Sequence, residues 1–272
     1  MKDLTGKIVV ITGASSGLGA EAARALHRLG ARVVLVGRSP DRTAALAAEL
    51  GVTGHTADFT RLADVRDLAS RLLDTVPRVD VLAANAGGIP RDKALTADGI
   101  EPVLQANALG PWLLTRLLLP LLDGGRVVAT SSRSHTGATL PAPDHLDRIA
   151  LSANGLGPHQ VYARAKLVGG VLLRELGRRH PGTTVADFHP GIMASNFGRY
   201  LGGLGAVLKV VASPVLDSPA QGARRLVDLV GSEEDVDGRY FVRGLPAEGS
   251  PLLADQALGG RLWALAERLV DG

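Results

Sequence analysis

The sequence predicts an α/β protein in which helices cover both faces of a doubly wound, mostly parallel sheet of about seven strands. Three observations favour this fold. Short β-branched runs alternate with helical segments in the N-terminal half. A glycine-rich loop directly follows the first of these runs. The length of 272 residues suits one large α/β domain, so we expect a single domain over residues 1–272.

The expected elements follow one another as βαβ units. The run I-V-V-I is typical of a buried parallel strand, and the alanine-rich segment after the glycine loop predicts a helix that ends near Leu29, before Gly30. Helices of 10 to 15 residues between strands indicate right-handed crossovers. We expect strands at Ile8–Ile11, Arg32–Val36, a run ending at Ala57, and Val79–Ala83, and helices at Asp41–Leu50 and Arg61–Thr75.

Composition excludes several classes of function. Hydrophobic residues make up 46% of the chain and charged residues 21%, which is typical of a globular protein. The net charge of +3 is scattered, and aromatic residues (3%) are too scarce for a base-stacking surface, so we expect no nucleic-acid partner. The absence of cysteine excludes disulfides and thiolate metal sites, and the seven histidines lack metal-ligand spacing, so no metal is expected.

The chain also lacks the patterns of targeted and membrane proteins. The N-terminus, Met1 to Lys7, is polar and does not resemble a signal peptide. The longest apolar stretch, Leu113 to Leu122, is interrupted by polar residues and proline and is too short to span a bilayer. We therefore expect a cytoplasmic protein, and the alanine- and arginine-rich composition suggests a bacterial source.

The glycine loop predicts a dinucleotide site. Its glycines, Gly13, Gly17 and Gly19, have G-x-x-x-G-x-G spacing between a strand and a helix. Such a loop gives a tight turn, and the helix N–H groups after it face the phosphates of a bound nucleotide. The alternative is a glycine turn that only packs the helix on the strand. Correct flanking elements favour the nucleotide.

The end of the second expected strand distinguishes the two nicotinamide cofactors. An NAD site needs an acid there for the ribose 2′-hydroxyl, and an NADP site needs a cation for the 2′-phosphate. Gly37-Arg38-Ser39 offers no acid, and the guanidinium of Arg38 matches phosphate geometry. NADP(H) is therefore expected over NAD(H), although Arg38 could instead be one more exposed arginine.

Tyr162 and Lys166 are separated by one helical turn and would lie on one face of a helix. A lysine ammonium can lower the pKa of a phenol, which is about 10 when unperturbed, toward a value useful for proton transfer. Taken alone the pair could be incidental on an exposed helix face. Its meaning depends on the motifs that come before it.

Those motifs resemble the short-chain dehydrogenase/reductase family over essentially the whole chain. T-G-x-x-x-G-x-G is followed, in the family's order, by Asp58, by Asn85-Ala86-Gly87, by Asn107 in L-Q-A-N-A-L-G, by Ser131-Ser132 after a fifth strand, by Tyr162 and Lys166, and by His189-Pro190-Gly191 after a sixth. The resemblance implies a three-layer Rossmann fold. It also implies cofactor contacts at Gly13, Ser15, Ser16, Gly17, Leu18, Gly19, Arg38, Asp58, Phe59, Asn85, Ala86, Gly87, Tyr162, Lys166, Pro190, Gly191, Ile192 and Ser195.

Within the family the chain looks most like the retinol dehydrogenase and WW-domain oxidoreductase group. The run S-S-R-S-H from Ser131, the H-P-G form, and G-R-Y-F from Gly238 carry this likeness. Two departures occur. Ala84 replaces the first asparagine of N-N-A-G, and Ser195 replaces the usual threonine after P-G. Neither change removes a group that the family's chemistry needs.

The resemblance also implies the roles of a catalytic set. Tyr162 would be the general acid in reduction and the base in oxidation, and Lys166 would favour the phenolate and bind the nicotinamide ribose. Ser132 would donate a hydrogen bond to the substrate oxygen. The choice of Ser132 over the adjacent Ser131 rests on family alignment. Asn107 would hold a bend in its helix and a water that relays protons to Lys166.

Two segments are expected to shape the substrate cleft. Residues 136–159 are rich in Pro, Gly, Ala and Asp, and residues 192–216 form an apolar segment in the position of a lid. An apolar lid favours a hydrophobic ketone or aldehyde and its alcohol. The alternatives are reduction of an activated C=C bond, or NADPH sensing or scaffolding without turnover. The protein could be a monomer or a homodimer.

Overall fold

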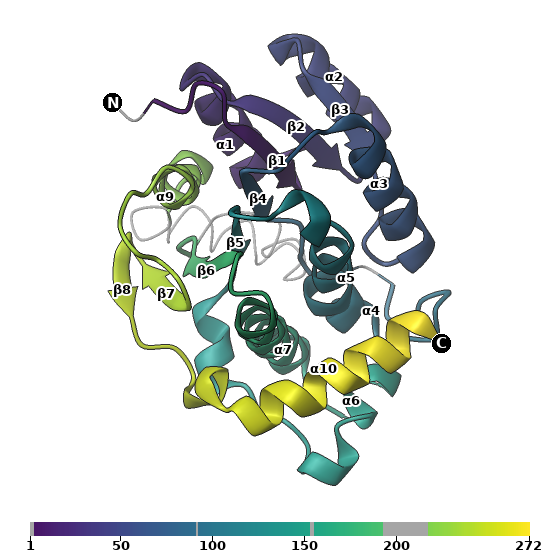
Figure 1. Cartoon of the computed structure of the whole chain (residues 1–272). Helices are drawn as coiled ribbons and strands as arrows, with labels where there is room; N and C mark the ends of the chain where they lie inside the picture. The colour runs from purple at the N-terminus through teal and green to yellow at the C-terminus, as the bar shows by residue number, and fades with distance from the viewer. Residues whose placement is uncertain (1–2, 91, 153–154, 193–216) are drawn as a thin grey trace, which may run out of the picture.

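A computed structural model describes residues 3–90, 92–152, 155–192 and 217–272. The α/β prediction is confirmed (Figure 1). The sheet has eight strands in the order β3-β2-β1-β4-β5-β6-β7-β8. All neighbouring pairs are parallel except β7 and β8. The strands are β1 (Ile8–Thr12), β2 (Arg32–Gly37), β3 (Thr53–Thr56), β4 (Val81–Ala84), β5 (Arg126–Thr130), β6 (Thr184–His189), β7 (Arg239–Val242) and β8 (Leu245–Ala247).

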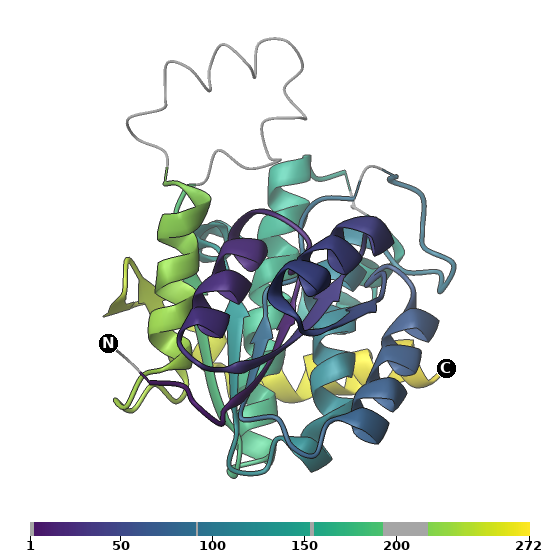
Figure 2. The same cartoon turned by 90° about the horizontal axis from the view of Figure 1, so that it is seen from above.

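Helices cover both faces of this sheet. In Figure 2 the helices α1, α2 and α9 stand on the near side, and α10 lies on the far side. The helices are α1 (Gly17–Arg28), α2 (Pro40–Leu50), α3 (Leu62–Thr75), α4 (Pro102–Leu104), α5 (Gly110–Leu117), α6 (Arg148–Leu151), α7 (Pro158–Arg179), α9 (Pro219–Val230) and α10 (Gln256–Asp271). A π-helix, Gln105–Leu109, joins α4 to α5, and short 3-10 turns lie at Leu119–Leu121, Arg133–Gly137, Pro143–His145 and Pro251–Ala254.

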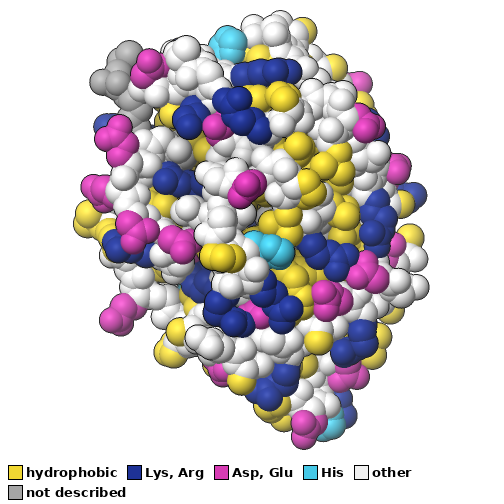
Figure 3. Space-filling model, in the orientation of Figure 1, with side chains coloured by type: hydrophobic (Ala, Val, Ile, Leu, Met, Phe, Trp, Pro, Cys, Tyr) yellow, Lys and Arg dark blue, Asp and Glu magenta, His cyan; other side chains and the backbone are white. Residues whose placement is uncertain are grey.

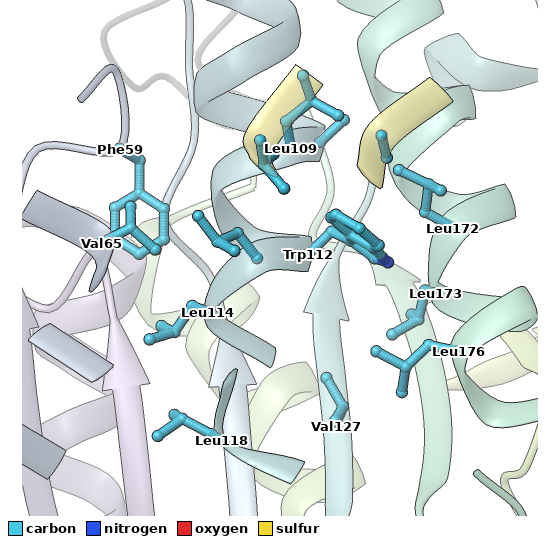
Figure 4. Packing of buried hydrophobic residues seen from close by; sticks show 14 of the residues in the cluster. Phe59, Val65, Leu109, Trp112, Leu114, Leu118, Val127, Leu172, Leu173 and Leu176 are labelled. Carbon is cyan, nitrogen blue, oxygen red and sulfur yellow. The ribbon is translucent and has the colours of Figure 1, made fainter. Parts of the chain in front are cut away.

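Alternation along the strands produces two cores. Val9 and Ile11 of β1 pack with α1 and α9 on one face, whereas Ile8 and Val10 pack with α3, α5 and α7 on the other. Successive side chains of a strand point to opposite faces, so a strand buried on both sides must be apolar at every position. This is why β1 reads as the continuous run I-V-V-I. Figure 4 shows the second core, in which Trp112 lies among leucines of α7.

The expected strand boundaries differ from the structure by one or two residues. The strand β1 ends at Thr12 and not at Ile11, and β2 ends at Gly37 and not at Val36. The strand expected to end at Ala57 ends at Thr56, and the strand expected at Val79–Ala83 is β4 at Val81–Ala84. Ala57 and Val79 are both buried. The Ala57 N–H still donates to the Gly37 carbonyl of β2 at 3.2 Å, whereas the Val79 N–H donates to the Leu121 carbonyl, outside the sheet.

The C-terminal helix α10 crosses the outside of α7 (Figure 1). Trp263 of α10 meets Trp112 of α5 edge to face, with ring centroids 5.0 Å apart. Arg179 of α7 lies over the Trp263 ring at 4.5 Å, and Arg116 of α5 forms an ion pair with Asp271 at 2.6 Å. The outer faces of α5 and α7 are thus partly covered by the chain itself.

The segment 136–159, expected as a substrate loop, is anchored to the body where it is described. It contains two short helical turns and α6, and Ile149 and Ala150 are buried in the core. The Ala150 carbonyl accepts from the Glu101 N–H at 2.7 Å, and the Thr139 carbonyl accepts from Arg164 at 3.0 Å. The described part of this segment therefore packs against the body of the protein beside α7. Most of the expected lid, residues 193–216, lies outside the described residues.

Charged side chains of both signs are interspersed over the face drawn in Figure 3. Within the described residues, no cluster of three or more potential metal ligands occurs. In the same part of the chain, every helix is too short or too polar to cross a membrane.

Candidate active site

Tyr162 and Lys166 lie on α7, and the expected arrangement on one helix face is confirmed. The Lys166 ammonium is 5.6 Å from the centroid of the Tyr162 ring. Lys166 is only 7% exposed, and its Nζ donates a hydrogen bond to the Thr130 carbonyl at 2.9 Å. Thr130 ends β5, so this bond ties the middle of α7 to the carboxyl end of the sheet. In doubly wound folds, ligands bind at that end.

Ser132 stands beside the phenol. It begins the 3-10 turn Arg133–Gly137, and its Oγ accepts from the Ser134 N–H at 3.2 Å. The Ser132 hydroxyl also hydrogen-bonds the Tyr162 phenol, which counters part of the rise in that phenol's pKa. Ser131 is buried, and its N–H donates to the Phe188 carbonyl at 2.8 Å. Of the two serines, the geometry brings Ser132 to Tyr162.

The pKa values of the pair differ from the expectation. Burial raises the pKa of Tyr162 to about 12, although the hydrogen bond from Ser132 opposes the rise. Burial lowers the pKa of Lys166 to about 8, and the Asp187 carboxylate opposes that fall. The expected lowering of the phenol pKa is therefore wrong for the protein without its cofactor, because burial of the phenol has the largest influence on that pKa. The phenol remains protonated at neutral pH.

Asn107 lies in the π-helix Gln105–Leu109, the distortion expected as a bend. Its Oδ1 accepts from the Gly88 N–H at 2.8 Å, and its Nδ2 donates to the carbonyls of Gly88 (2.6 Å) and Val103 (2.8 Å). A Cβ on Gly87 would lie 2.6 Å from Asn107 Oδ1 and 3.2 Å from Lys166 Nζ. Asn107 therefore holds the Gly87-Gly88 turn close to the lysine.

The glycine loop between β1 and α1 has the close packing that its spacing predicts. Gly13 has φ +68°, and a Cβ there would lie 2.9 Å from the Asn85 amide nitrogen. A Cβ on Gly19 would collide with the Gly13 carbonyl. Ser15 is half-buried, Ser16 and Gly17 are exposed, and Leu18 is buried. Ser16 precedes α1, so the free N–H groups of the first helical turn open at this loop, as a phosphate site requires.

Thr12 is a site residue that the sequence argument missed. Its Oγ1 accepts from the N–H groups of Asn85 (3.0 Å) and Ala86 (2.9 Å), and its carbonyl accepts from the Asn85 side chain at 3.0 Å. The Asn85 Oδ1 accepts from Thr130 at 3.0 Å. This chain of bonds links the ends of β1, β4 and β5. The sequence does contain a signal for Thr12, because it is the first residue of the T-G-x-x-x-G-x-G motif.

Three residues expected to contact the cofactor, Arg38, Asp58 and Phe59, follow the ends of β2 and β3. Arg38 is exposed directly after β2, as a 2′-phosphate contact would need. Asp58 follows β3, and its Oδ1 accepts from the N–H (2.9 Å) and hydroxyl (2.8 Å) of Thr60. Phe59 is different, because its side chain is buried in the core. Only its backbone is suited to a cofactor contact.

The Pro190-Gly191-Ile192 segment after β6 is held by two residues that the sequence argument did not single out. Asp217 accepts from the Ile192 N–H at 3.2 Å, and its own N–H donates to the Ile192 carbonyl at 2.9 Å. Arg225 of α9 pairs with Asp217 at 2.6 Å and donates to the Pro190 carbonyl. Gly191 has φ +105°, which favours glycine. Ser195 lies outside the described residues.

The residues present fit a nicotinamide dinucleotide. The glycines leave room for pyrophosphate where a Cβ would meet backbone, and Asn85, Ala86 and Gly87 follow β4 between that loop and Lys166. At the far side of the same carboxyl edge of the sheet lie Ser132, Tyr162 and Lys166. Residues that could contact the dinucleotide thus follow one another from the end of β2 to the middle of α7.

Comparisons with known proteins agree with this arrangement. Residues 7–139 match the family model described as short chain dehydrogenase. A protein of Streptomyces sp. (strain C5) with the name "Putative daunorubicin C-13 ketoreductase DnrU" is 40% identical over 96% of this chain and 91% of its own. Retinol dehydrogenase 14 of Homo sapiens is 34% identical over 97% and 86%. The crystal structure of an uncharacterised protein from Mycobacterium paratuberculosis superposes with a TM-score of 0.81 at 30% identity, covering 100% of this chain and 96% of that one.

The fold, the row of motif residues along the sheet edge and the relatives lead to one family. Its members are oxidoreductases that act on carbonyl and alcohol groups with a nicotinamide cofactor. The likeness to the retinol dehydrogenase group, expected from the motifs, is confirmed. The chain belongs to the short-chain dehydrogenase/reductase family.

Proposed function

We propose that the protein interconverts a lipophilic ketone or aldehyde and its alcohol, with NADP(H) as the redox partner. The observation that carries the proposal is the convergence of a protonated phenol, a serine hydroxyl and a buried lysine at the carboxyl end of the sheet. Hydride arrival at a carbonyl carbon leaves an alkoxide that must be stabilised and protonated. The Ser132 hydroxyl is suited to stabilise the alkoxide, and the Tyr162 phenol is suited to protonate it.

Each residue has a defined part in the reduction. The reduced nicotinamide, when bound, supplies the hydride. The Ser132 hydroxyl donates a hydrogen bond to the substrate oxygen and turns it toward Tyr162. Tyr162 gives its proton to the alkoxide, and the Lys166 ammonium stabilises the phenolate that remains. Asn107 keeps the Gly87-Gly88 turn beside Lys166 through its three hydrogen bonds.

The surroundings of Tyr162 support an apolar substrate. Val103, Val161 and Ala165 form a small buried cluster against which Tyr162 itself packs. Ile89 and Leu156 complete this cluster and are partly exposed. A hydrophobic lining with a few placed polar groups is the usual form of a small-molecule site. The ketoreductase name of the DnrU relative supports a ketone within this class.

Reduction of an activated C=C bond would use the same phenol and remains the second candidate. The hydrogen bond between Ser132 and Tyr162 supports the carbonyl, because two adjacent hydroxyl groups can both turn to donate to a single substrate oxygen. A sensor without turnover would have no need of either donor.

The test is NADPH oxidation with a panel of apolar ketones, aldehydes and conjugated enones, followed by absorbance. We expect turnover with carbonyls and a loss of about 10²- to 10⁴-fold in Tyr162→Phe with unchanged NADPH affinity, since general acid catalysis contributes that much. Ser132→Ala should also lose turnover, whereas the matched Ser131→Ala should keep it. Absence of turnover with every compound, or full activity of Tyr162→Phe, contradicts the proposal.

A further inference from the structure

Lys166 and a buried carboxylate line the same cavity. The cavity has a volume of about 50 Å³ and lies between strands β4, β5 and β6 on one side and helices α5 and α7 on the other. Lys166, Asn107, Trp112, Thr115 and Asp187 are among the residues that line it. At roughly 10–15 Å³ for each buried water, it has room for a few.

The charge of Lys166 has no direct counter-ion among the described residues. Its Nζ bonds a neutral carbonyl, that of Thr130, and none of the ion pairs within 4.0 Å in this part of the chain includes it. An ammonium that is 7% exposed is costly unless an opposite charge lies near enough to act through the protein interior. The stabilising charge must therefore act across a gap.

Asp187 of β6 is placed to provide it. The residue is 1% exposed, and its Oδ1 accepts from Arg174 of α7 at 2.8 Å. Its Oδ2 has no hydrogen-bond partner among the described residues, and neither does the buried Nε1 of Trp112 in the same cavity. Gly170, one helical turn after Lys166, packs over this carboxylate, because a Cβ on it would lie 4.0 Å from Asp187 Oδ2.

We propose that Asp187 is a positioning residue of the hydride-transfer site, whose carboxylate acts across the cavity to keep Lys166 in its ammonium form. The role of that ammonium rests on the proposed function, but the link between the two side chains does not. Buried water in the cavity would extend the link from Asp187 Oδ2 toward Lys166 Nζ. Nothing in the sequence motifs points to Asp187.

The other titratable groups around Asp187 and Lys166 cannot replace this charge. Tyr162 and Arg174 face the pair from α7, His135 from the 3-10 turn, and Tyr240 from β7. Burial lowers the pKa of His135 and raises the pKa of Tyr240, so both are neutral at pH 7. Arg174 is a cation. Removal of the Asp187 charge would thus leave two cations, Lys166 and Arg174, without a carboxylate in this set.

The experiment measures the protonation of Lys166 without turnover. The chain has five lysines, so a protein labelled with ¹³C at lysine Cε gives few signals, and Lys166→Met identifies the one that belongs to Lys166. We expect its midpoint near pH 8 in the wild type, in line with its lowered pKa. Asp187→Asn should lower the midpoint by about one pH unit or more, the usual effect of a nearby opposite charge.

Two further variants separate electrostatics from damage to the fold. Arg174→Met removes the cation that offsets Asp187 and should raise the Lys166 midpoint. Glu175→Gln is the matched control, because Glu175 is a buried carboxylate on α7 that pairs with Arg178 and Arg179 and does not line the cavity. It should leave the midpoint unchanged. If the Asp187–Arg174 ion pair only supports the fold, Asp187→Asn and Arg174→Met should move the Lys166 midpoint in the same direction or not at all.

The proposal is overturned if Asp187→Asn leaves the Lys166 midpoint unchanged, or if both variants move it the same way. If Asp187→Asn does not fold, Arg174→Met decides alone: a raised midpoint supports the link, and an unchanged or lowered one overturns it. Shifts of opposite direction in a protein that turns over no substrate would establish the link and contradict the proposed function.

Discussion

Tyr162 is able to act as an acid because its environment favours the neutral phenol. Burial raises its pKa to about 12, so it holds its proton until charge develops on the substrate oxygen. Burial has the opposite effect on the pKa of Lys166, because it favours the neutral amine and lowers that pKa to about 8. Under the proposed function, the pair therefore holds at neutral pH the two protons that reduction needs.

The pH dependence of reduction follows from these two values. The Lys166 ammonium is present below about pH 8 and is lost above it, whereas Tyr162 stays protonated until about pH 12. The pKa of His189 is lowered to about 4 by burial and neighbouring arginines, so His189 does not titrate in this range. We expect kcat/KM with a ketone to be level near pH 6 to 7 and to fall above about pH 8. Steady-state rates across pH 5 to 10 check this, and a rate that rises through pH 8 contradicts it.

Arg38 tests the choice of cofactor at a single residue. It is exposed after β2, where a guanidinium can meet a 2′-phosphate without moving other side chains. In Arg38→Ala the Kd for NADPH should rise roughly tenfold or more, since a charge-assisted contact of about 1.5–3 kcal/mol is lost, while the Kd for NADH stays the same. Fluorescence titration gives both constants. Arg42→Ala, on the exposed side of α2, is the control, and an unchanged NADPH preference in Arg38→Ala would refute the assignment.

At the scale of elements, the site depends on how strand ends are joined. β1 and β4 are neighbours in the sheet, and beyond their ladder Thr12 continues the connection by accepting from two backbone N–H groups of the turn after β4. That turn contains Asn85, Ala86 and Gly87, all expected to bind the cofactor. The turn that is expected to bind the cofactor is thus tied to the end of the sheet by these hydrogen bonds.

Thr12→Val should disrupt this connection with little change in shape. It leaves the Ala86 N–H without its acceptor, while the Asn85 N–H keeps its hydrogen bond to the Ala83 carbonyl. An unsatisfied buried donor costs about 1–3 kcal/mol, so we expect a loss of roughly 1–3 kcal/mol in the free energy of unfolding and weaker NADPH binding. Urea unfolding and a binding titration measure the two effects. Thr12→Ser keeps the hydroxyl and should retain most of both; equal losses in the two variants would show that the hydroxyl is not the cause.

At the scale of the whole molecule, α10 adds a layer outside the three-layer sandwich. Its Trp263 packs on Trp112, and its Asp271 pairs with Arg116, so it closes the side of α5 and α7 away from the sheet. The edge-to-face rings and the Arg179 guanidinium over Trp263 stabilise this contact by more than the burial of apolar area alone would. The same contact closes the core around Trp112, which lines the cavity beside Lys166.

Trp263→Ala should therefore destabilise the protein and expose an apolar surface. Removing a buried tryptophan costs about 3–5 kcal/mol, and the uncovered faces of α5 and α7 should promote self-association. Thermal unfolding and sedimentation measure the two consequences. Leu245→Ala, at a side chain that is 70% exposed, is the control and should change stability by no more than about 0.5 kcal/mol. A Trp263→Ala protein as stable as the control would show that α10 is dispensable.

Much of the fold was accessible from the sequence because its signals are local. The I-V-V-I run, the glycine spacing and the spacing of Tyr162 and Lys166 each depend on near neighbours in the chain. In the structure they correspond to the strand β1, the turn into α1 and two side chains on one face of α7. The antiparallel β8 and the path of α10 across α7 were not accessible in this way. They depend on contacts between segments far apart in sequence, for which a single chain carries no periodic pattern.

The same division applies to the site. The sequence by itself determined which residue types stand at the sheet edge, because T-G-x-x-x-G-x-G, N-A-G and Y-x-x-x-K each occupy a short stretch. Only the tertiary structure decided their protonation, since burial and not the neighbouring ammonium sets the pKa of Tyr162. Only the tertiary structure brought Thr12 to Asn85, Asp217 to Ile192, and Asp187 to the cavity of Lys166. A carboxylate acts on an ammonium through the distance between them and the solvent excluded around them, and folding alone fixes both.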